Sequence, residues 1–508
     1  MTVLPTSSSS SSPALTATSH SNSNGVNGIN GTLKPHSEHS FATRSIHVGS
    51  EPHLSSSSGV STPLDLSTTY AQSSVGIHKG FEYSRSSNPT RLALERLIAS
   101  LEGADQGLKR ELRDGADEWV RENGPAALAF ASGSAATATV VQALVGNKGH
   151  IVSVGDVYGG TSRYMLKVAG PLQDAETTFV DLSYRAVDGE VESDSGSEDS
   201  KKERQDQAIL QRLEEAVRPE TKVIWIETPT NPMLNLIPIR LISTFAISRS
   251  IYLVVDNTFA SPYLQLPLSL GASVVLGSST KYLSGHSDVI GGYVASSSPT
   301  ILMKLRFLQN AHGAVPSPFD AYLLIRSFKT LSLRVRQHSL NGLAIATYLD
   351  REATRAGLVR DVRYPGLRRS RETPAQSRER ELAWEQITPD FRRWVEKQGY
   401  TKESEGGFPC GGMVTFHIRS EFEGSQERSE TAEKFLQGLK VFTLAESLGG
   451  VESLAELPVK MTHGGVSPAH RVTLGIDGEL IRLSVGVEDV EDLVEDVKRA
   501  LEGAVQVA

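Results

Sequence analysis

Short apolar runs separated by helix-length intervals are the feature of this sequence that most restricts its fold. Five runs are mostly β-branched or aliphatic: 126–130, 150–154, 223–226, 252–255 and 273–276. Strands with this spacing need crossover connections, which place helices on both faces of a mainly parallel sheet. We therefore predict an α/β fold whose larger domain is built on one such sheet.

Two segments carry the apolar spacing of amphipathic helices. The first covers 89–101, follows Asn88 as a capping residue and begins with proline. The second covers 490–504 and also places four apolar side chains on one face. Both patterns predict a helix that packs by one buried face.

A polar tail and three polar interruptions divide the rest of the chain. Residues 1–40 are rich in Ser, Asn and Gly, and we expect them to be disordered because they cannot bury enough apolar surface. We interpret 105–124, 188–206 and 368–407 as insertions in surface connections. The second should be a solvated loop, whereas aromatic residues at helical spacing indicate that part of the third folds onto the surface.

Charge and cysteine content exclude several classes of protein. The 51 Lys and Arg against 59 Asp and Glu give a formal charge of −8, without the broad basic face that a nucleic-acid partner requires. A single cysteine, Cys410, cannot form an intrachain disulfide or a multi-cysteine metal site, so we expect a cytoplasmic protein without a metal. No apolar run approaches the ~20 residues of a membrane helix. A transit peptide stays open as an alternative to a merely disordered N-terminal tail, because residues 1–37 contain no acidic residue.

Polar side chains follow the apolar runs at the edge where parallel strands collect ligands. The small-residue turn at 132–136 enters a helix and could hold a phosphate. Asp256 ends the fourth run, and Lys281 follows the fifth. Pyridoxal phosphate (PLP) requires such a set, in which the lysine forms a Schiff base and the acid keeps the ring nitrogen protonated.

Each member of this set also has a plain structural interpretation. A lone lysine such as Lys281 is often a solvated surface residue, and Asp256 could cap a turn or a helix. Tyr158 could be an ordinary half-buried aromatic residue. The prediction therefore depends on the ordered set and not on any one residue.

Six motifs in order carry a resemblance to a known family: GFEYSRSSNPTR at 80–91, ASGSAA at 131–136, DVYGGT at 156–161, IETPTNP at 226–232, VVDNTF at 254–259 and SSTKYLSGHSD at 278–288. From about residue 43 to about 501 the chain closely resembles the PLP-dependent enzymes of cysteine and methionine metabolism. The resemblance implies the type I PLP-dependent transferase fold, similar to aspartate aminotransferase. That fold has a large, mainly parallel sheet domain of the seven-stranded type and a smaller C-terminal α/β domain.

The resemblance assigns roles in cofactor binding and catalysis. It implies that Lys281 forms the Schiff base and moves protons, that Asp256 pairs with the ring nitrogen, and that Tyr158 stacks on the ring. The other implied cofactor contacts are Gly133 and Ser134 through the backbone, Asn231, Ser278 and Thr280, and, from a neighbouring subunit, Tyr83 and Arg85.

Three further residues are implied to bind the substrate. Arg482 matches the arginine that holds the substrate α-carboxylate, a role that suits guanidinium geometry. Ser447 is a second contact, and Glu446 could meet the distal ammonium group of cystathionine. The alternative for Glu446 is a solvated acid on a loop.

The resemblance implies α,γ-elimination of L-cystathionine to L-cysteine, 2-oxobutanoate and ammonia in trans-sulfuration. One scaffold in this family supports several reactions, so γ-replacement, as in a γ-synthase or an acetylhomoserine sulfhydrylase, stays open. A catalytically silent binding protein is a more distant alternative.

The resemblance also implies an arrangement of domains and subunits. We expect an N-terminal arm at 41–90 that contacts a neighbouring subunit, a cofactor domain at 91–330 and a C-terminal domain at 331–508. The partners would be a small amino-acid substrate and further copies of the chain, in a homotetramer built as two dimers.

Overall fold

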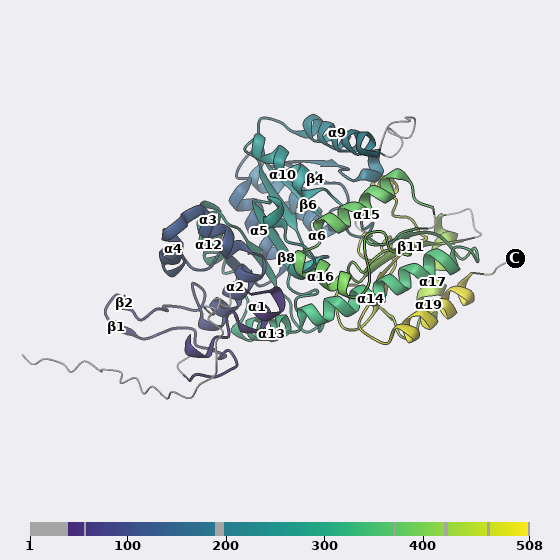
Figure 1. Ribbon diagram of the computed structural model, residues 1–508. Coiled ribbons are helices and arrows are strands. Elements are labelled where there is room, and N and C mark those ends of the chain that lie inside the picture. Colours follow the sequence, from purple (N-terminus) through teal and green to yellow (C-terminus); the bar gives the residue numbers. More distant parts are fainter. Residues whose placement is uncertain are drawn as a thin grey trace, which may run out of the picture. The chain divides into compact units, whose positions relative to one another are not determined.

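Two multistranded β-sheets organise the part of the chain that the computed structural model describes (Figure 1). The described residues are 39–54, 57–187, 198–369, 371–420, 425–464 and 468–505. The disorder expected for 1–40 therefore falls outside them, apart from the last two residues of that tail. Among the described residues, no helix has the length and apolar character needed to cross a bilayer.

The first sheet has seven strands in the order β3-β9-β8-β7-β6-β4-β5. Its strands are β3 (Ala127–Phe130), β4 (His150–Val154), β5 (Glu176–Val180), β6 (Thr221–Glu227), β7 (Tyr252–Asp256), β8 (Val274–Ser278) and β9 (Gly292–Ala295). The β5-β4-β6-β7-β8 pairings are parallel, whereas β9 runs antiparallel to both β3 and β8. The predicted seven-stranded, mainly parallel sheet is therefore confirmed.

All five apolar runs of the sequence form strands of this sheet. Every residue of β3 and β4 is buried, as expected for parallel strands covered on both faces. The runs did not predict β5, whose residues are partly exposed, or β9, which is only four residues long.

Helices come before the first strand of this sheet in the chain, connect its strands, and follow its last strand. They are α1 (Phe41–His47), α2 (Pro89–Leu101), α3 (Ala104–Leu112), α4 (Ala116–Asn123), α5 (Gly133–Leu144), α6 (Gly159–Tyr164), α7 (Gly170–Gln173), α9 (Glu198–Ala216), α10 (Ile239–Ser248), α11 (Ser261–Leu264), α12 (Pro299–His312) and α13 (Pro318–Phe328). Short helical turns are η2 (Pro52–Leu54), η3 (Arg113–Gly115), η4 (Met165–Ala169), η5 (Tyr184–Val187), η6 (Pro267–Leu270) and η7 (Leu349–Ala353).

Helix α2 begins and packs as its sequence predicts. The Asn88 side chain accepts hydrogen bonds from the backbone N–H groups of Thr90 (2.9 Å) and Arg91 (3.2 Å), which satisfies two donors at the helix start. Leu94 and Leu97 on its apolar face are fully buried. The helix contacts β3 and β9.

The second sheet has five strands in the order β10-β11-β14-β13-β12. Its strands are β10 (Val359–Arg363), β11 (Met413–Ile418), β12 (Thr443–Leu444), β13 (Leu454–Glu456) and β14 (Leu480–Ser484). The helices in this part of the chain are α14 (Leu331–Tyr348), α15 (Pro374–Gln386), α16 (Pro389–Lys397), α17 (Ser425–Gly438), α18 (Pro468–Leu474) and α19 (Val490–Ala504). Helices α17 and α19 lie side by side (Figure 1). The predicted helix at 490–504 is confirmed, with Leu493, Val497 and Leu501 buried.

The first two polar interruptions are more helical than expected. Residues 104–123 form α3 and α4, and Ala104 and Leu108 are buried. The prediction of a solvated loop at 188–206 is wrong for 198–206, which begin α9; residues 188–197 lie outside the described part. Ile209 and Leu213 are buried later in α9, and the cooperativity of helix formation carries the helix back into the polar segment.

The third polar interruption contributes to the core. It contains α15 and α16, as its aromatic spacing predicted. Phe391 on α16 is fully buried and contacts Tyr263 edge-on, with ring centroids 5.5 Å apart. The sequence indicated that part of this stretch folds onto the surface; in addition, Phe391 fills space in the core beside α11.

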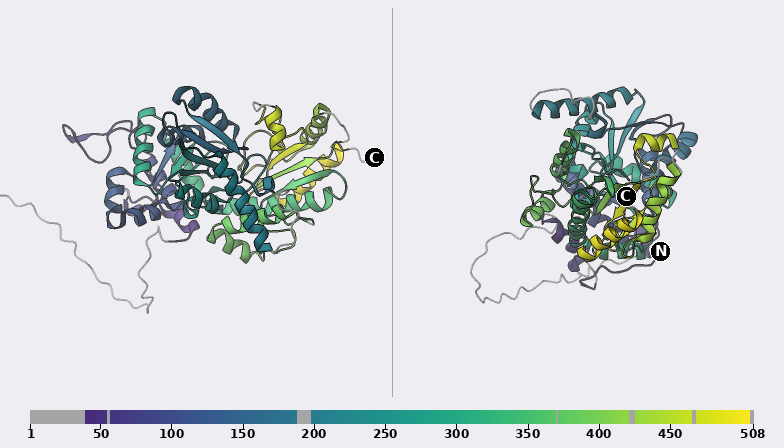
Figure 2. Two further views of the ribbon diagram at one scale, coloured as in Figure 1. Left: turned by 90° about the horizontal axis from the view of Figure 1, so that it is seen from above. Right: turned by 90° about the vertical axis from the view of Figure 1, so that its right-hand side faces the viewer.

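The N-terminal arm divides into a packed part and an exposed part. Phe41 on α1 is buried against Tyr263, with ring centroids 4.9 Å apart. By contrast, the hairpin of β1 (Gln72–Ser74) and β2 (Ile77–His78) is fully exposed and projects away from both sheets (Figure 2).

Candidate active site

A cavity of about 640 Å³ lies where the carboxyl ends of the first-sheet strands face residues from the second sheet. Glu227, Asp256 and Ser278 line it as the last residues of β6, β7 and β8. Arg482 on β14 lines the same cavity. Ligands bind at this edge of open parallel sheets, so the fold brings chemistry-bearing side chains to the expected place.

Lys281 lies in this cavity just after β8. Its Nζ donates a hydrogen bond to Ser447 Oγ at 2.7 Å. Burial, and secondly the positive charge of Arg482, lower the pKa of Lys281 to about 8. The amine is therefore more readily deprotonated near neutral pH than an ordinary lysine.

Ser447 connects the lysine to the arginine. Its hydroxyl accepts from Lys281, and its carbonyl oxygen accepts from Arg482 Nη2 at 2.8 Å. Its φ of +102° lies in a region that side chains other than glycine rarely adopt. Backbone strain of this kind persists where surrounding contacts fix it, and it concentrates at functional sites.

Two carboxylates lie side by side at the ends of β6 and β7. Glu227 and Asp256 are partners in the parallel register, and both are buried. Burial raises the pKa of each, and the charge of Asp256 raises the pKa of Glu227 further. Asp256 Oδ1 accepts from the Thr258 N–H at 3.0 Å, while Glu227 Oε2 accepts from the Tyr158 N–H at 2.9 Å.

Arg482 is held by a buried set of acceptors. Its Nη1 lies 2.9 Å from Glu456 Oε1 and 2.9 Å from Asn231 Oδ1. Glu456 is its partner in the antiparallel β13–β14 register, and both side chains are almost fully buried. Burial lowers the pKa of Arg482, but a guanidinium group stays charged in proteins. The cavity thus contains a fixed, preorganised cation.

The start of α5 offers free backbone donors to the cavity. Ser132 caps the helix by accepting from the Ala135 N–H at 3.0 Å. The N–H groups of Gly133 and Ser134 have no intrahelical carbonyl to bind, because they belong to the first turn. A Cβ atom on Gly133 would lie 3.0 Å from the Ser278 Cβ. The glycine therefore permits a close approach that forms a concave anion site at the helix N-terminus.

Tyr158 lies between β4 and α6, with 45% of its surface exposed in the cavity wall. A Cβ atom on Gly160 would lie 2.4 Å from the Tyr158 ring. The ring therefore lies directly beside Gly160, at a place where a side chain on that residue would not fit.

The cavity brings together eleven residues that the sequence singled out: Gly133, Ser134, Tyr158, Asn231, Asp256, Ser278, Thr280, Lys281, Glu446, Ser447 and Arg482. The structure does not bring Tyr83 and Arg85 to it. These two lie together beside a separate surface hollow, with the Arg85 guanidinium 5.8 Å from the Tyr83 ring centroid.

Sequence reasoning missed Glu456 as a site residue and left Glu227 without a role. Both are acidic residues at the end of an apolar strand. An acid in that position is the signal that could have identified them from the sequence, because a buried charge needs a partner. Cys410 is buried, and burial raises the pKa of its thiol to about 12.

Comparison with known proteins identifies relatives along nearly the whole chain. The model of a family described as Cys/Met metabolism PLP-dependent enzyme matches residues 42–111, 120–194, 198–383 and 395–502. The cystathionine γ-lyase of Bos taurus is 43% identical over 471 residues, which cover 92% of this chain and 95% of the relative. That of Saccharomyces cerevisiae is 40% identical over 471 residues, covering 91% and 98%.

A solved structure of a related protein shares the fold of this chain. The crystal structure of cystathionine γ-lyase from Lactobacillus plantarum complexed with L-serine has a TM-score of 0.71 and 35% sequence identity to this chain. The match covers 92% of this chain and 99% of that one. The similarity therefore spans both sheets and the cavity between them.

Proposed function

This chain belongs to the family of PLP-dependent enzymes of cysteine and methionine metabolism, and we propose that it catalyses the α,γ-elimination of L-cystathionine. The chain is thereby a PLP-dependent carbon–sulfur lyase. The reaction consumes cystathionine and water and releases L-cysteine, 2-oxobutanoate and ammonia. The convergence of Lys281, Asp256 and Arg482 in one cavity is the observation that carries this proposal.

The residues of the cavity fit the cofactor. The helix N-terminus at Gly133 and Ser134, beside the Ser278 and Thr280 hydroxyls, forms the concave site that a phosphate group needs. Asp256 supplies a buried acceptor for the ring nitrogen, and the exposed face of Tyr158 suits stacking. Asn231 lines the same cavity as a further polar contact. When bound, PLP supplies an electron sink for the carbanion chemistry at the substrate α-carbon.

Lys281 moves protons at the substrate carbons. Its lowered pKa, about 8, leaves a useful fraction of the amine neutral near pH 7, so it can accept the α-proton. The hydrogen bond from Nζ to Ser447 Oγ at 2.7 Å orients the amine within the cavity. After the α-proton has moved, loss of a β-proton allows the γ-carbon to release the sulfur of cysteine.

Arg482 and Glu446 orient the substrate. The guanidinium of Arg482 binds the α-carboxylate, and its bonds to Glu456, Asn231 and Ser447 fix its position before the substrate arrives. Glu446 is exposed and lines the cavity, where its carboxylate can receive the distal ammonium group of cystathionine.

Product analysis tests the reaction. Purified holoenzyme given L-cystathionine alone should release cysteine and 2-oxobutanoate in equal amounts. If neither product is released and the enzyme instead converts an acetylated homoserine and a thiol, the reaction is γ-replacement.

The proposal includes a homotetramer built as two dimers, located in the cytoplasm. Tyr83 and Arg85 lie away from the cavity of their own chain, and Tyr83 is 47% exposed, which is consistent with a contribution to the site of a neighbour. Sedimentation equilibrium of the holoenzyme tests the subunit number. Activity regained by mixing an inactive Tyr83 variant with an inactive Lys281 variant tests the shared site.

A further inference from the structure

Glu227 is a buried acid at the end of β6 whose part in the active site is still open. Its side chain lines the cavity, and the residue is only 3% exposed. Its Oε2 accepts a hydrogen bond from the Tyr158 N–H at 2.9 Å, and its carboxyl group also accepts from the Asn231 N–H. Tyr158 and Asn231 are both proposed cofactor contacts. One carboxyl group thus holds the backbone at two of these contacts.

Neither of the two donors belongs to a helix or a strand. Tyr158 directly precedes α6, and Asn231 lies in the turn after β6. Their N–H groups therefore lie outside the regular hydrogen bonding of helices and sheets. A backbone donor that loses its partner away from water is costly. Removal of the Glu227 acceptor should therefore allow both turns to shift.

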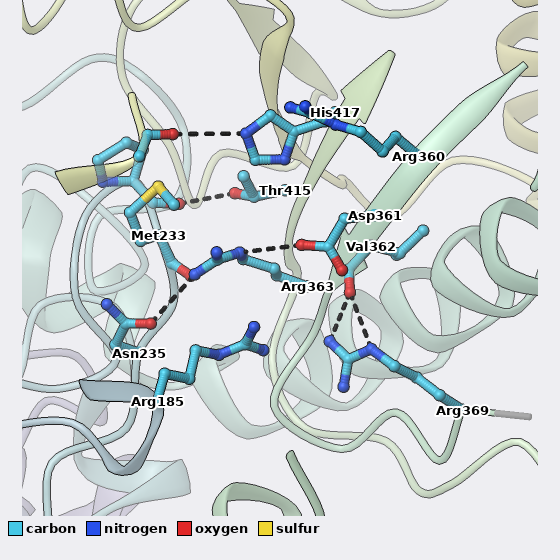
Figure 3. A network of polar contacts seen from close by, with 12 residues as sticks. Arg185, Met233, Asn235, Arg360, Asp361, Val362, Arg363, Arg369, Thr415 and His417 are labelled. Carbon is cyan, nitrogen blue, oxygen red and sulfur yellow. Dashed lines mark hydrogen bonds and ion pairs between the residues drawn. The ribbon is translucent and has the colours of Figure 1, made fainter. Parts of the chain in front are cut away.

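Contacts from the second sheet also hold the segment 231–235. Arg363 on β10 donates from Nη1 to Asn235 Oδ1 at 3.2 Å (Figure 3). Thr415 on β11 donates from Oγ1 to the Pro232 carbonyl at 2.7 Å. This segment is therefore bound to the second sheet while it follows a strand of the first.

Asp156 joins the same segment to the turn that carries Tyr158. Asn235 Nδ2 donates to Asp156 Oδ2 at 2.9 Å, and Asp156 is buried. Asp156 precedes Tyr158 by two residues. The two turns are thus joined by two carboxyl groups, and that of Glu227 binds directly at the residues proposed to contact the cofactor.

Asn231 also connects Glu227 to the arginine proposed to bind the substrate. Asn231 Oδ1 accepts a hydrogen bond from Arg482 Nη1 at 2.9 Å. Because Glu227 holds the backbone of Asn231, it also sets the position of this acceptor. A shift of Asn231 would weaken a contact that fixes Arg482 before the substrate α-carboxylate arrives.

The position of its acceptor oxygen matters more for this role of Glu227 than its charge does. Glu227 and Asp256 are partners in the parallel register. Burial, and secondly the charge of Asp256, raise the pKa of Glu227 well above its usual value. A protonated carboxyl group still has an oxygen that accepts hydrogen bonds. A neutral Glu227 can therefore hold the two turns without placing a second negative charge beside Asp256.

We propose that Glu227 is a positioning residue of the active site. Through the N–H groups of Tyr158 and Asn231 it sets the place of the ring that stacks on PLP and of the acceptor that holds Arg482. This inference rests on the proposed function, because it takes Tyr158 and Asn231 as cofactor contacts.

Titration of apoprotein with PLP tests the role, because the dissociation constant does not depend on turnover. Glu227→Asp keeps the charge but is one methylene shorter, so it should raise the PLP dissociation constant about tenfold. Glu227→Ala lacks the acceptor altogether and should do the same. Glu227→Gln keeps the length and an acceptor oxygen, and should stay within about threefold of the unaltered protein. The KM for cystathionine should follow the same order.

A buried acid elsewhere provides the matched control. Glu102 accepts from the Tyr293 hydroxyl at 2.6 Å and is 1% exposed. Glu102→Ala should lower the Tm but leave the PLP dissociation constant unchanged, which separates positioning from a general loss of stability. At saturating PLP, the visible circular dichroism band of the cofactor should weaken in Glu227→Asp and persist in Glu227→Gln.

Two results would overturn the inference. One is PLP binding by Glu227→Asp and Glu227→Ala that is as tight as in the unaltered protein. The other is a loss of affinity in Glu227→Gln as large as in Glu227→Asp, which would show that the charge and not the acceptor matters. If the unaltered protein itself did not bind PLP, the proposed function would be wrong, and this result is distinct from a difference among the variants.

Discussion

The lowered pKa of Lys281 makes a quantitative prediction about cofactor loading. Only the neutral amine can attack the aldehyde of PLP. With a pKa of about 8 in place of 10.5, about one amine in ten is neutral at pH 7, against about three in ten thousand for an ordinary lysine. Apoprotein should therefore react about 300-fold faster at pH 7 than a free lysine of equal nucleophilicity.

The assay is stopped-flow mixing of apoprotein with PLP across a range of pH. The rate should rise tenfold per pH unit below about 8 and level off above it. N-acetyl-lysine mixed with PLP provides the reference profile, which should keep rising toward pH 10.

The variant Arg482→Gln tests the second cause of the shift. Removing this neighbouring positive charge should move the inflection of the profile to higher pH. A protein profile that rises toward pH 10 like that of N-acetyl-lysine would refute the assigned environment of Lys281.

Three further predictions concern other parts of the structure. Glu446→Ala should raise the KM for cystathionine about tenfold, with no rise for a thioether substrate that lacks the distal amine; equal rises would contradict the role. Phe391→Ala should lower the free energy of unfolding by about 3–5 kcal/mol in urea titration, because the ring is fully buried against Tyr263, and a change below about 1 kcal/mol would be inconsistent with this packing. Burial raises the pKa of Glu102 to about 8, so the native state keeps a proton that the unfolded state loses between about pH 4.5 and 8. Stability should fall as pH rises through this window, and Glu102→Gln should reduce the fall; an unchanged slope would argue against a protonated Glu102.

The sequence predicted the first sheet well because its strands are buried on both faces. Five β-branched or aliphatic runs encode that burial directly, and each forms a strand. Strand β9, with the sequence Gly-Tyr-Val-Ala, was not predicted, although its four residues are also buried. Helix α9 extends into an acidic segment because tertiary packing of its later turns outweighs local composition.

The active site was predictable where one motif contained several of its residues. Ser278, Thr280 and Lys281 belong to one short segment at the end of β8 and directly after it. The contact of Arg482 with Asn231 joins residues 251 positions apart, and the pairing with Glu456 depends on β13–β14 register.

Reduction of the holoenzyme with borohydride, followed by peptide mass spectrometry, tests the central claim most directly. The account predicts one pyridoxyl group per chain, attached to the peptide that contains Lys281. Attachment to a different lysine, or no attachment in fully loaded protein, would contradict it.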